Sequence, residues 1–171
     1  MPITPFHFGP AGTAALLGRK YIDLPAFILV NVIIDIEPFI VILFRLQYPI
    51  HGYLHTFLIG SFVATFFAVL LYCCKGCAVR IMNLLTLPYE PAFLKILVSS
   101  IAGAWLHVLL DAPLYSDIRP FLPFSFNPLY GIVGYFPLYL LCTLFFIPAL
   151  VLAKKNSTAG LDADNRKRLN G

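Results

Sequence analysis

Residues 25–44, PAFILVNVIIDIEPFIVILF, decide the fold of this chain, because almost every one of them is apolar. Twenty residues of α-helix rise about 30 Å at about 1.5 Å per residue, which is the thickness of the hydrocarbon core of a bilayer. Asp35 and Glu37 lie inside this stretch, and insertion of one charged side chain to that depth costs about 2.5–3.5 kcal/mol. The stretch therefore predicts a transmembrane helix whose two acids serve a function.

The composition of the whole chain agrees with this interpretation. Hydrophobic residues make up 60% of the 171 residues, charged residues only 12%, and the mean hydropathy is +0.85. So few charges cannot cover the surface of a water-soluble domain, so most of the surface faces lipid. The net charge of +4 comes from basic residues scattered singly or in pairs between apolar runs. This pattern excludes a nucleic-acid-binding surface, and no nucleic-acid partner is expected.

Three further stretches are long and apolar enough to cross a bilayer: residues 55–74, 95–115 and 131–153. A shorter apolar segment, residues 7–18, would cover only about 18 Å as a helix, so it enters the bilayer partway. The sequence therefore predicts an all-α polytopic membrane protein with four transmembrane helices and a short, half-inserted N-terminal helix.

The basic residues indicate how these helices are oriented. Ten of the twelve Lys and Arg residues fall in residues 19–20, 75–95 and 154–168, which lie on one side of the predicted spans. The other side has only Arg45 and Arg119. Basic residues are retained in the cytoplasm, so the 75–95 connection and the C-terminus are predicted to be cytoplasmic. The expected location is an integral position in the cell (inner or plasma) membrane.

The chain divides into two parts by polarity. Residues 1–153 are predicted to form a single transmembrane helical domain. Residues 154–171 are polar and charged, and we expect them to form a disordered cytoplasmic tail.

Seven side chains that can ligate a metal lie at membrane depth or at the mouth of a span. Counted from the cytoplasmic ends at about 1.5 Å per residue, Asp35 lies about 15 Å deep, His107 about 18 Å and Asp111 about 24 Å. All seven fall between mid-bilayer and the non-cytoplasmic surface, and they include every histidine of the chain. The seven are His7, Asp35, Glu37, His51, His55, His107 and Asp111.

The spacing of these residues brings some of them together. His107 and Asp111 are four residues apart and share one helix face. The pair His51 and His55 has the same spacing and shares a face if its helix begins early enough.

Asp35 and Glu37 would point about 200° apart on a regular helix. Pro38 removes a backbone donor, clashes one turn back and disfavours helical geometry at Glu37. A local break there is predicted to turn both carboxylates inward, as happens in membrane helices that line a cavity.

Imidazole and carboxylate ligands together suit a divalent metal, with zinc favoured and manganese or iron as alternatives. The number of candidate groups allows one ion, with the remaining side chains supporting its ligands and acting as general base, or two ions. Glu37 is the spare carboxylate expected to act as the catalytic general base, although whether Glu37 or His51 ligates the metal stays open. The predicted metal ligands are His7, Asp35, His51, His55, His107 and Asp111.

Residues 115–130 are rich in aromatic side chains, which is typical of the membrane interface. Asp117, Arg119 and Asn127 in this segment are candidates for a lid over the site or for binding a polar headgroup.

The order of four short motifs within about residues 1–130 resembles the membrane-bound metal-dependent hydrolases of the LexA-regulated, inner-membrane type. The motifs are His7, Asp35-Ile36-Glu37-Pro38, His51-x-x-x-His55-Thr56 and His107-x-x-x-Asp111. The chain departs from that family at the acidic motif, which often reads D-x-D-H, and at the histidine pair, which is often spaced one residue wider. The resemblance implies a hydrolase, and it implies no particular substrate.

The function expected from these observations is metal-dependent hydrolysis of a lipid-borne ester or phosphoester, such as a phospholipid or an isoprenoid phosphate, near the non-cytoplasmic leaflet. The sequence has no G-x-S-x-G or H-E-x-x-H motif, so a serine hydrolase or a zincin protease is poorly supported. The alternatives are a divalent-metal transporter, in which four spans form a pathway only as a homodimer, or a structural membrane protein that binds metal for folding.

Overall fold

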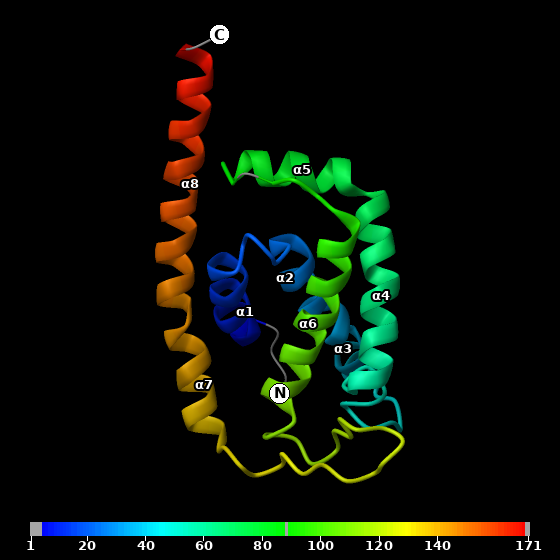
Figure 1. The fold of residues 1–171 in the computed structure, drawn as a ribbon. Helices are drawn as coiled ribbons and strands as arrows, with labels where there is room; N and C mark the ends of the chain where they lie inside the picture. The colour runs from blue at the N-terminus through cyan, green and yellow to red at the C-terminus, as the bar shows by residue number, and fades with distance from the viewer. Residues whose placement is uncertain (1–4, 88, 170–171) are drawn as a thin grey trace.

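The computed structural model describes residues 5–87 and 89–169, with side chains up to residue 158 (Figure 1). The described residues form helices and loops and contain no β-strand, which confirms the predicted all-α class. The helices are α1 (Pro5–Leu17), α2 (Leu24–Ile34), α3 (Ile36–Phe44), α4 (Phe57–Cys73), α5 (Lys75–Leu84), α6 (Phe93–Asp111), α7 (Tyr135–Leu144) and α8 (Phe146–Leu169).

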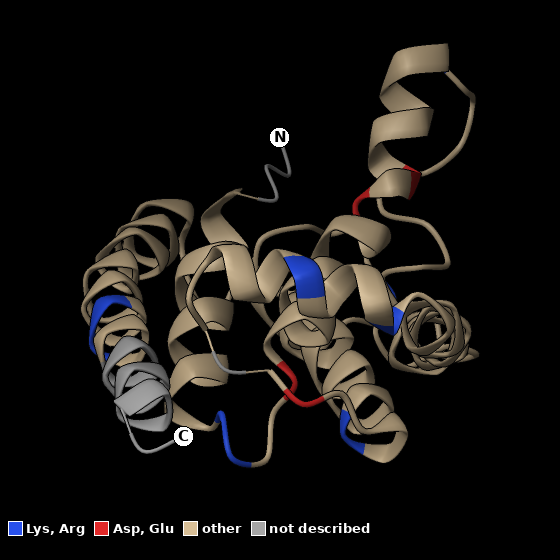
Figure 2. Ribbon diagram, turned by 90° about the horizontal axis from the view of Figure 1, so that it is seen from above, with Lys and Arg blue, Asp and Glu red and all other residues tan. Residues whose placement is uncertain are grey.

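Three segments of this part of the chain are helical, long and apolar enough to cross a membrane: Leu24–Phe44, Phe93–Asp111 and Tyr135–Thr158. Helices α4 and α5 form a fourth candidate if they are counted as one span, although they are bent by 76° at Cys74. These lengths fit a membrane protein. Charged positions are correspondingly few along the ribbon (Figure 2). Four transmembrane helices and the half-inserted position of α1 remain predictions.

The stretch that decides the fold is broken at Asp35, which ends α2 and precedes α3. Pro38 has no N–H to donate to the carbonyl of Ile34, and its ring clashes with that carbonyl, so regular geometry fails one turn before the proline. The break therefore lies at Asp35, two residues before Glu37, whereas the sequence predicted it at Glu37. A similar break separates α7 from α8 at Phe145, three residues before Pro148.

Helix α6 packs between α2 and α4, and close contact with α2 depends on Gly103. A Cβ atom at Gly103 would lie 2.6 Å from Val30 Cγ1 and 2.7 Å from the carbonyl oxygen of Phe27. The small side chains Ala64 and Ala104 fill the adjoining core, and both are fully buried. This packing holds the C-terminal half of α6, with its histidine and aspartate, against α2.

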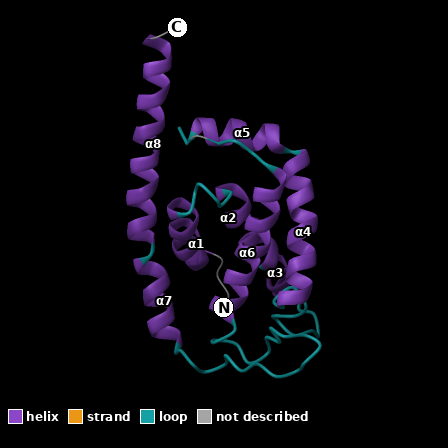
Figure 3. Ribbon diagram, in the orientation of Figure 1, coloured by secondary structure: helices purple, strands orange, loops and turns teal. Residues whose placement is uncertain are grey.

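Helix α4 begins at Phe57 and not at residue 55. Thr56 caps it, since its Oγ1 accepts a hydrogen bond of 3.0 Å from the N–H of Ile59. His51 and His55 consequently lie in the loop before the helix and do not share a helical face. This loop lies at the same end of the bundle as residues 112–134 (Figure 3).

The last predicted span also differs at both ends. Its helix begins at Tyr135 and not at 131, because Gly131 adopts a φ of +79° and Gly134 is extended. At the other end, α8 continues through Leu169, so the backbone of the tail that we expected to be disordered is helical to that residue. The apolar turns at the start of α8 supply the helical nucleus, and lysine, arginine, alanine and leucine residues among weaker helix formers extend it.

Candidate metal centre

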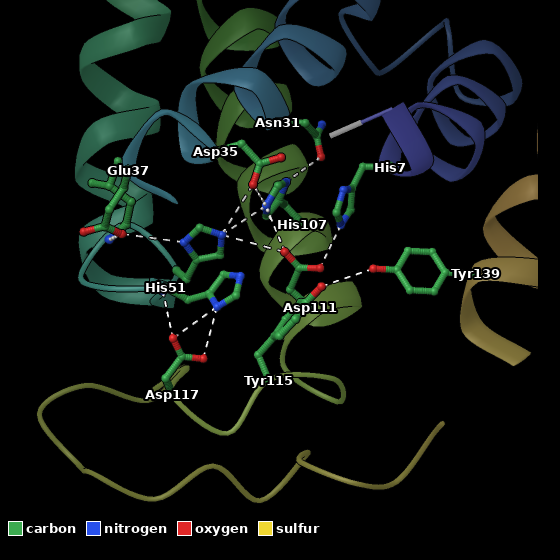
Figure 4. A network of polar contacts seen from close by, with 12 residues as sticks. His7, Asn31, Asp35, Glu37, His51, His107, Asp111, Tyr115, Asp117 and Tyr139 are labelled. Carbon is green, nitrogen blue, oxygen red and sulfur yellow. Dashed lines mark hydrogen bonds and ion pairs between the residues drawn. The ribbon is translucent and has the colours of Figure 1, made fainter. Parts of the chain in front are cut away.

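Four buried side chains from three parts of the chain converge near the loop end of the bundle (Figure 4). Asp35 comes from the break between α2 and α3, His55 from the loop before α4, and His107 and Asp111 from the last turns of α6. Each is at most 8% exposed. One ligand atom from each of the four lies within 4.8 Å of the other three, so the cluster could hold a metal ion.

The separations within this cluster are close to those of a metal-binding tetrahedron. His107 Nε2 lies 3.3 Å from both Asp35 Oδ1 and Asp111 Oδ2. His55 Nε2 lies 3.7 Å from the same two oxygens and 3.3 Å from His107 Nε2. Ligands of a tetrahedral ion with bonds of about 2.0–2.2 Å are about 3.3–3.6 Å apart. Two imidazole nitrogens facing each other with two carboxylate oxygens therefore form a donor set that fits a cation.

Asn31 fixes the tautomer of His107. Its Nδ2 donates a hydrogen bond of 2.7 Å to the carbonyl of Phe27, so its Oδ1 is turned toward His107 Nδ1, at 3.3 Å. An amide oxygen can only accept, so the ring proton lies on Nδ1 and the lone pair of Nε2 faces the cluster. Sequence reasoning missed Asn31, although a polar residue four positions before Asp35 in an apolar helix was the available signal.

Glu37 holds the loop that carries His55. Its Oε1 accepts the N–H of Tyr53 and its Oε2 the N–H of Leu54, both at 2.9 Å, and Tyr48 donates to Oε1 at 3.3 Å. Oε2 also lies 3.6 Å from His55 Nδ1. A carboxylate on that side favours the tautomer with its proton on Nδ1, so the Nε2 lone pair of His55 points to the centre. The structure thus places Glu37 behind a candidate ligand.

His7, on α1, contacts the cluster from the opposite side. Its Nε2 lies 3.2 Å from Asp111 Oδ1, the carboxylate oxygen that faces away from His55 and His107. The rings of His7 and His107 stack with centroids 4.2 Å apart and an interplanar angle of 17°. His7 therefore supports Asp111 and lies outside the group of four.

His51 is paired with Asp117, as Figure 4 shows. The N–H of His51 donates to Asp117 Oδ2 at 2.9 Å, and its Nδ1 lies 3.1 and 3.2 Å from the two carboxylate oxygens. The ring stacks on Tyr115 at 4.1 Å and meets His55 edge-on at 4.9 Å. Its Nε2 is buried and has no hydrogen bond among the described residues.

The protonation of this pair follows from its surroundings. Burial, and then the neighbouring His55, lowers the pKa of His51 and outweighs the raising effect of Asp117, so the imidazole is neutral at pH 7. Burial alone would raise the pKa of Asp117, but the hydrogen bond from the His51 N–H and the adjacent ring lower it. The arrangement is an aspartate-oriented, neutral imidazole at the edge of the cluster.

The other two candidate lid residues lie farther from the cluster. Asn127 Nδ2 donates to the carbonyls of Ala112 and Tyr115, at 2.9 and 3.3 Å, and thereby ties residues 112–134 to the end of α6. Arg119 is exposed. The structure therefore brings Asp117 to the candidate site, uses Asn127 to hold the loop, and leaves Arg119 at the surface.

A narrow recess reaches the cluster between α1, α6 and α7. His7 and Asp111 lie at its polar end, and its apolar wall includes Phe6, Leu138 and Cys142. The volume of the recess that the centre of a water molecule can occupy is only about 10 Å³. The walls of the recess come from these three helices and from Leu114, just after α6.

No protein family, curated protein or solved structure matches this chain.

Proposed function

We propose that this chain is a membrane-embedded, metal-dependent hydrolase that acts on a lipid-borne ester or phosphoester. The observation that carries the proposal is the buried set of two imidazole nitrogens and two carboxylate oxygens at tetrahedral spacing, with a further neutral imidazole beside it. The order of motifs, which resembles that of the membrane-bound metal-dependent hydrolases, supports the same assignment.

The donor set of Asp35, His55, His107 and Asp111 suits zinc, manganese or iron. A divalent ion there would lower the pKa of a bound water toward about 7 and would polarise the scissile group. Four protein ligands fill a tetrahedral zinc ion, so hydrolysis with zinc requires expansion to five-coordination. Six-coordinate manganese or iron would leave positions for water and substrate without such expansion.

We assign the general base to His51 and not to Glu37. Asp117 holds His51 Nδ1, so the Nε2 lone pair is free to accept a proton at the edge of the centre. Glu37 already accepts two backbone N–H groups and faces His55 Nδ1, which suits a residue that positions His55. This assignment follows the logic of a carboxylate that orients an imidazole base.

A lipid-borne substrate is proposed because of the position of the recess. It reaches Asp111 beside α7, whose outer face is apolar, with Phe136 78% exposed and Leu144 51% exposed. A substrate that diffuses within the bilayer would reach the metal centre from that side. The distribution of basic residues supports a position of the centre toward the non-cytoplasmic leaflet.

The proposal is tested by metal content and turnover measured on the same preparations. Purified protein is expected to retain about one divalent ion per chain by elemental analysis, and His107→Ala to lose it. His51→Gln is expected to keep the metal and to lose hydrolysis of a phospholipid or an isoprenoid phosphate. Arg119→Gln, an exposed change in the same loop, is the matched control and should keep both. The proposal would be refuted if the purified protein contained no metal and if its lipid hydrolysis were unchanged both by chelators and in the His107→Ala variant.

One observation favours a second candidate, a structural metal site. Closed four-ligand sites are typical of ions that stabilise a fold. In that case chelation lowers the thermal unfolding temperature, and neither the wild type nor His51→Gln shows turnover on any lipid. Turnover that depends on His51 would favour the hydrolase.

A further inference from the structure

A second polar cavity lies at the opposite end of the bundle from the metal centre. Along α6, Lys95 and His107 are twelve residues apart, which is about 18 Å at 1.5 Å per residue. The volume of this cavity that the centre of a water molecule can occupy is about 50 Å³. Figure 2 looks onto this end, where basic and acidic positions lie near one another. The polar lining consists of Arg19, Asp23, Tyr89, Glu90, Lys95 and Asn156.

Asn156, on α8, supplies a hydrogen-bond donor that no described residue accepts. The residue is 9% exposed, and its Nδ2 has no hydrogen bond among the described residues. The adjacent Ser157 contacts Thr86 through their hydroxyl groups, which fixes this turn of α8 against the end of α5. A buried amide donor held rigidly in the wall of a cavity is available to an acceptor that enters the cavity.

Asp23 supplies the complementary acceptor. It is 1% exposed, and its Oδ1 caps α2 by accepting the N–H of Ala26 at 3.0 Å. Its Oδ2 makes no hydrogen bond of ordinary geometry to the described residues, although the Tyr89 hydroxyl lies close enough for each group to affect the pKa of the other. The same cavity wall therefore contains both a carboxylate oxygen and the unused amide.

Charged groups of both signs complete the lining. Lys95 Nζ donates one hydrogen bond of 2.8 Å, to the carbonyl of Arg19, and an ammonium group has two more protons to donate. The side chains of Arg19 and Glu90 are exposed at the rim. Two cations and two acids line one cavity, so a ligand of a single charge would be repelled by part of the wall. A ligand that carries both a negative and a positive group would pair with the cations and with the acids of the wall.

We propose that this cavity binds a phosphoethanolamine group, that is, a phosphate ester joined to a primary ammonium. The phosphate oxygens accept hydrogen bonds from Asn156 Nδ2, Lys95 and Arg19, and the ammonium donates to Asp23 Oδ2 and Glu90. The cavity lies at the ends of the apolar helices, the level at which lipid headgroups lie, so phosphatidylethanolamine can reach it. The site is separate from the metal centre and does not depend on the function proposed for that centre.

Retention of individual lipids by delipidated protein tests this proposal. Phosphatidylethanolamine, phosphatidylcholine and phosphatidylglycerol with the same acyl chains are added, and bound lipid is counted by native mass spectrometry. Phosphatidylethanolamine should be retained about tenfold better than the other two, because choline has no N–H to donate and phosphoglycerol has no cation. Displacement by water-soluble glycerophosphoethanolamine would assign the site to the free group, and persistence of the lipid would assign it to the headgroup; both support the chemistry.

Variants connect the preference to the cavity. Asn156→Leu, Arg19→Gln and Glu90→Gln should each reduce the preference for phosphatidylethanolamine, while circular dichroism shows the same helix content. Lys20→Gln and Lys154→Gln change exposed cations that do not line the cavity, and they should leave the preference intact. Equal retention of the three lipids, as expected of a cavity filled by water, would overturn the proposal. So would a preference that survives both Asn156→Leu and Arg19→Gln.

Discussion

Asp35 and Glu37, two residues apart in the chain, face opposite nitrogens of one imidazole ring. Asp35 Oδ1 lies 3.7 Å from His55 Nε2, and Glu37 Oε2 lies 3.6 Å from Nδ1 of the same ring. On a regular helix the two acids would diverge by about 200°, so this relationship exists only because α2 ends at Asp35. Asp35 thereby joins the candidate ligands, and Glu37 orients the ring of His55.

Pro38→Ala should therefore weaken metal binding even though it removes a helix breaker. An alanine restores the N–H donor, and proline costs about 3 kcal/mol more than alanine inside a helix, so α2 and α3 are expected to join through Asp35. Metal occupancy at limiting metal, measured by elemental analysis, should fall. Pro148→Ala repairs a similar break between α7 and α8, away from the cluster, and should leave occupancy unchanged. Equal occupancy in Pro38→Ala and wild type would contradict this account.

Asn31→Leu should reduce metal affinity by about 10–100-fold, the usual effect of removing a group that orients a ligand histidine. Without the amide oxygen, His107 no longer has an acceptor at Nδ1, so its proton is free to move to Nε2 and block the centre. Competition with a fluorescent chelator measures the affinity. Asn83→Leu, an exposed change of the same kind on α5, provides the control. The prediction fails if both variants bind metal as the wild type does.

Gly103→Ala should destabilise the fold by about 1–3 kcal/mol, the usual cost of overpacking. The new methyl group would lie 2.6 Å from Val30 Cγ1 and 2.7 Å from backbone oxygen of Phe27, so α2 and α6 must separate. Gly76→Ala on α5 has nothing within 4 Å of the added atom, and it should stabilise the helix by about 0.5–1 kcal/mol. Thermal unfolding of the two variants in one detergent should shift in opposite directions. A shift of the same sign in both would argue against close contact at Gly103.

Asp23→Asn should stabilise delipidated protein at pH 7 and have a smaller effect near pH 4. Burial raises the pKa of Asp23 above 3.8, so the folded protein holds this proton more tightly than the unfolded chain. Stability from this group is therefore present below the unfolded pKa and is lost as the pH rises through the folded one. Asparagine keeps the helix cap without the charge. Asp117, whose pKa is lowered, serves as the contrast, and Asp117→Asn should destabilise at pH 7.

The chemistry of the candidate centre could be predicted from the sequence because polar residues in an apolar chain are conspicuous. Every group of the buried cluster was among the predicted metal ligands, and His107 and Asp111 meet through ordinary helical spacing. The pairing of His51 with Asp117 could not be predicted, since the two residues are 66 positions apart and no periodicity relates them. The helical argument for His51 and His55 failed because Thr56 begins the helix after both of them.

The sequence by itself determined that the chain is helical and apolar enough for a membrane, and it predicted that its four histidines fall at one level with Asp35, Glu37 and Asp111. Both properties depend on composition and on rise per residue, which local sequence sets. The tertiary structure decided which of those residues meet. Metal-ligand geometry is fixed to tenths of an ångström, and such distances depend on long-range contacts such as Gly103 against α2 and Glu37 against the loop that carries His55. Pro38 predicted a break in the helix, but only the folded chain showed that Asp35 and Glu37 use that break to hold one histidine from two sides.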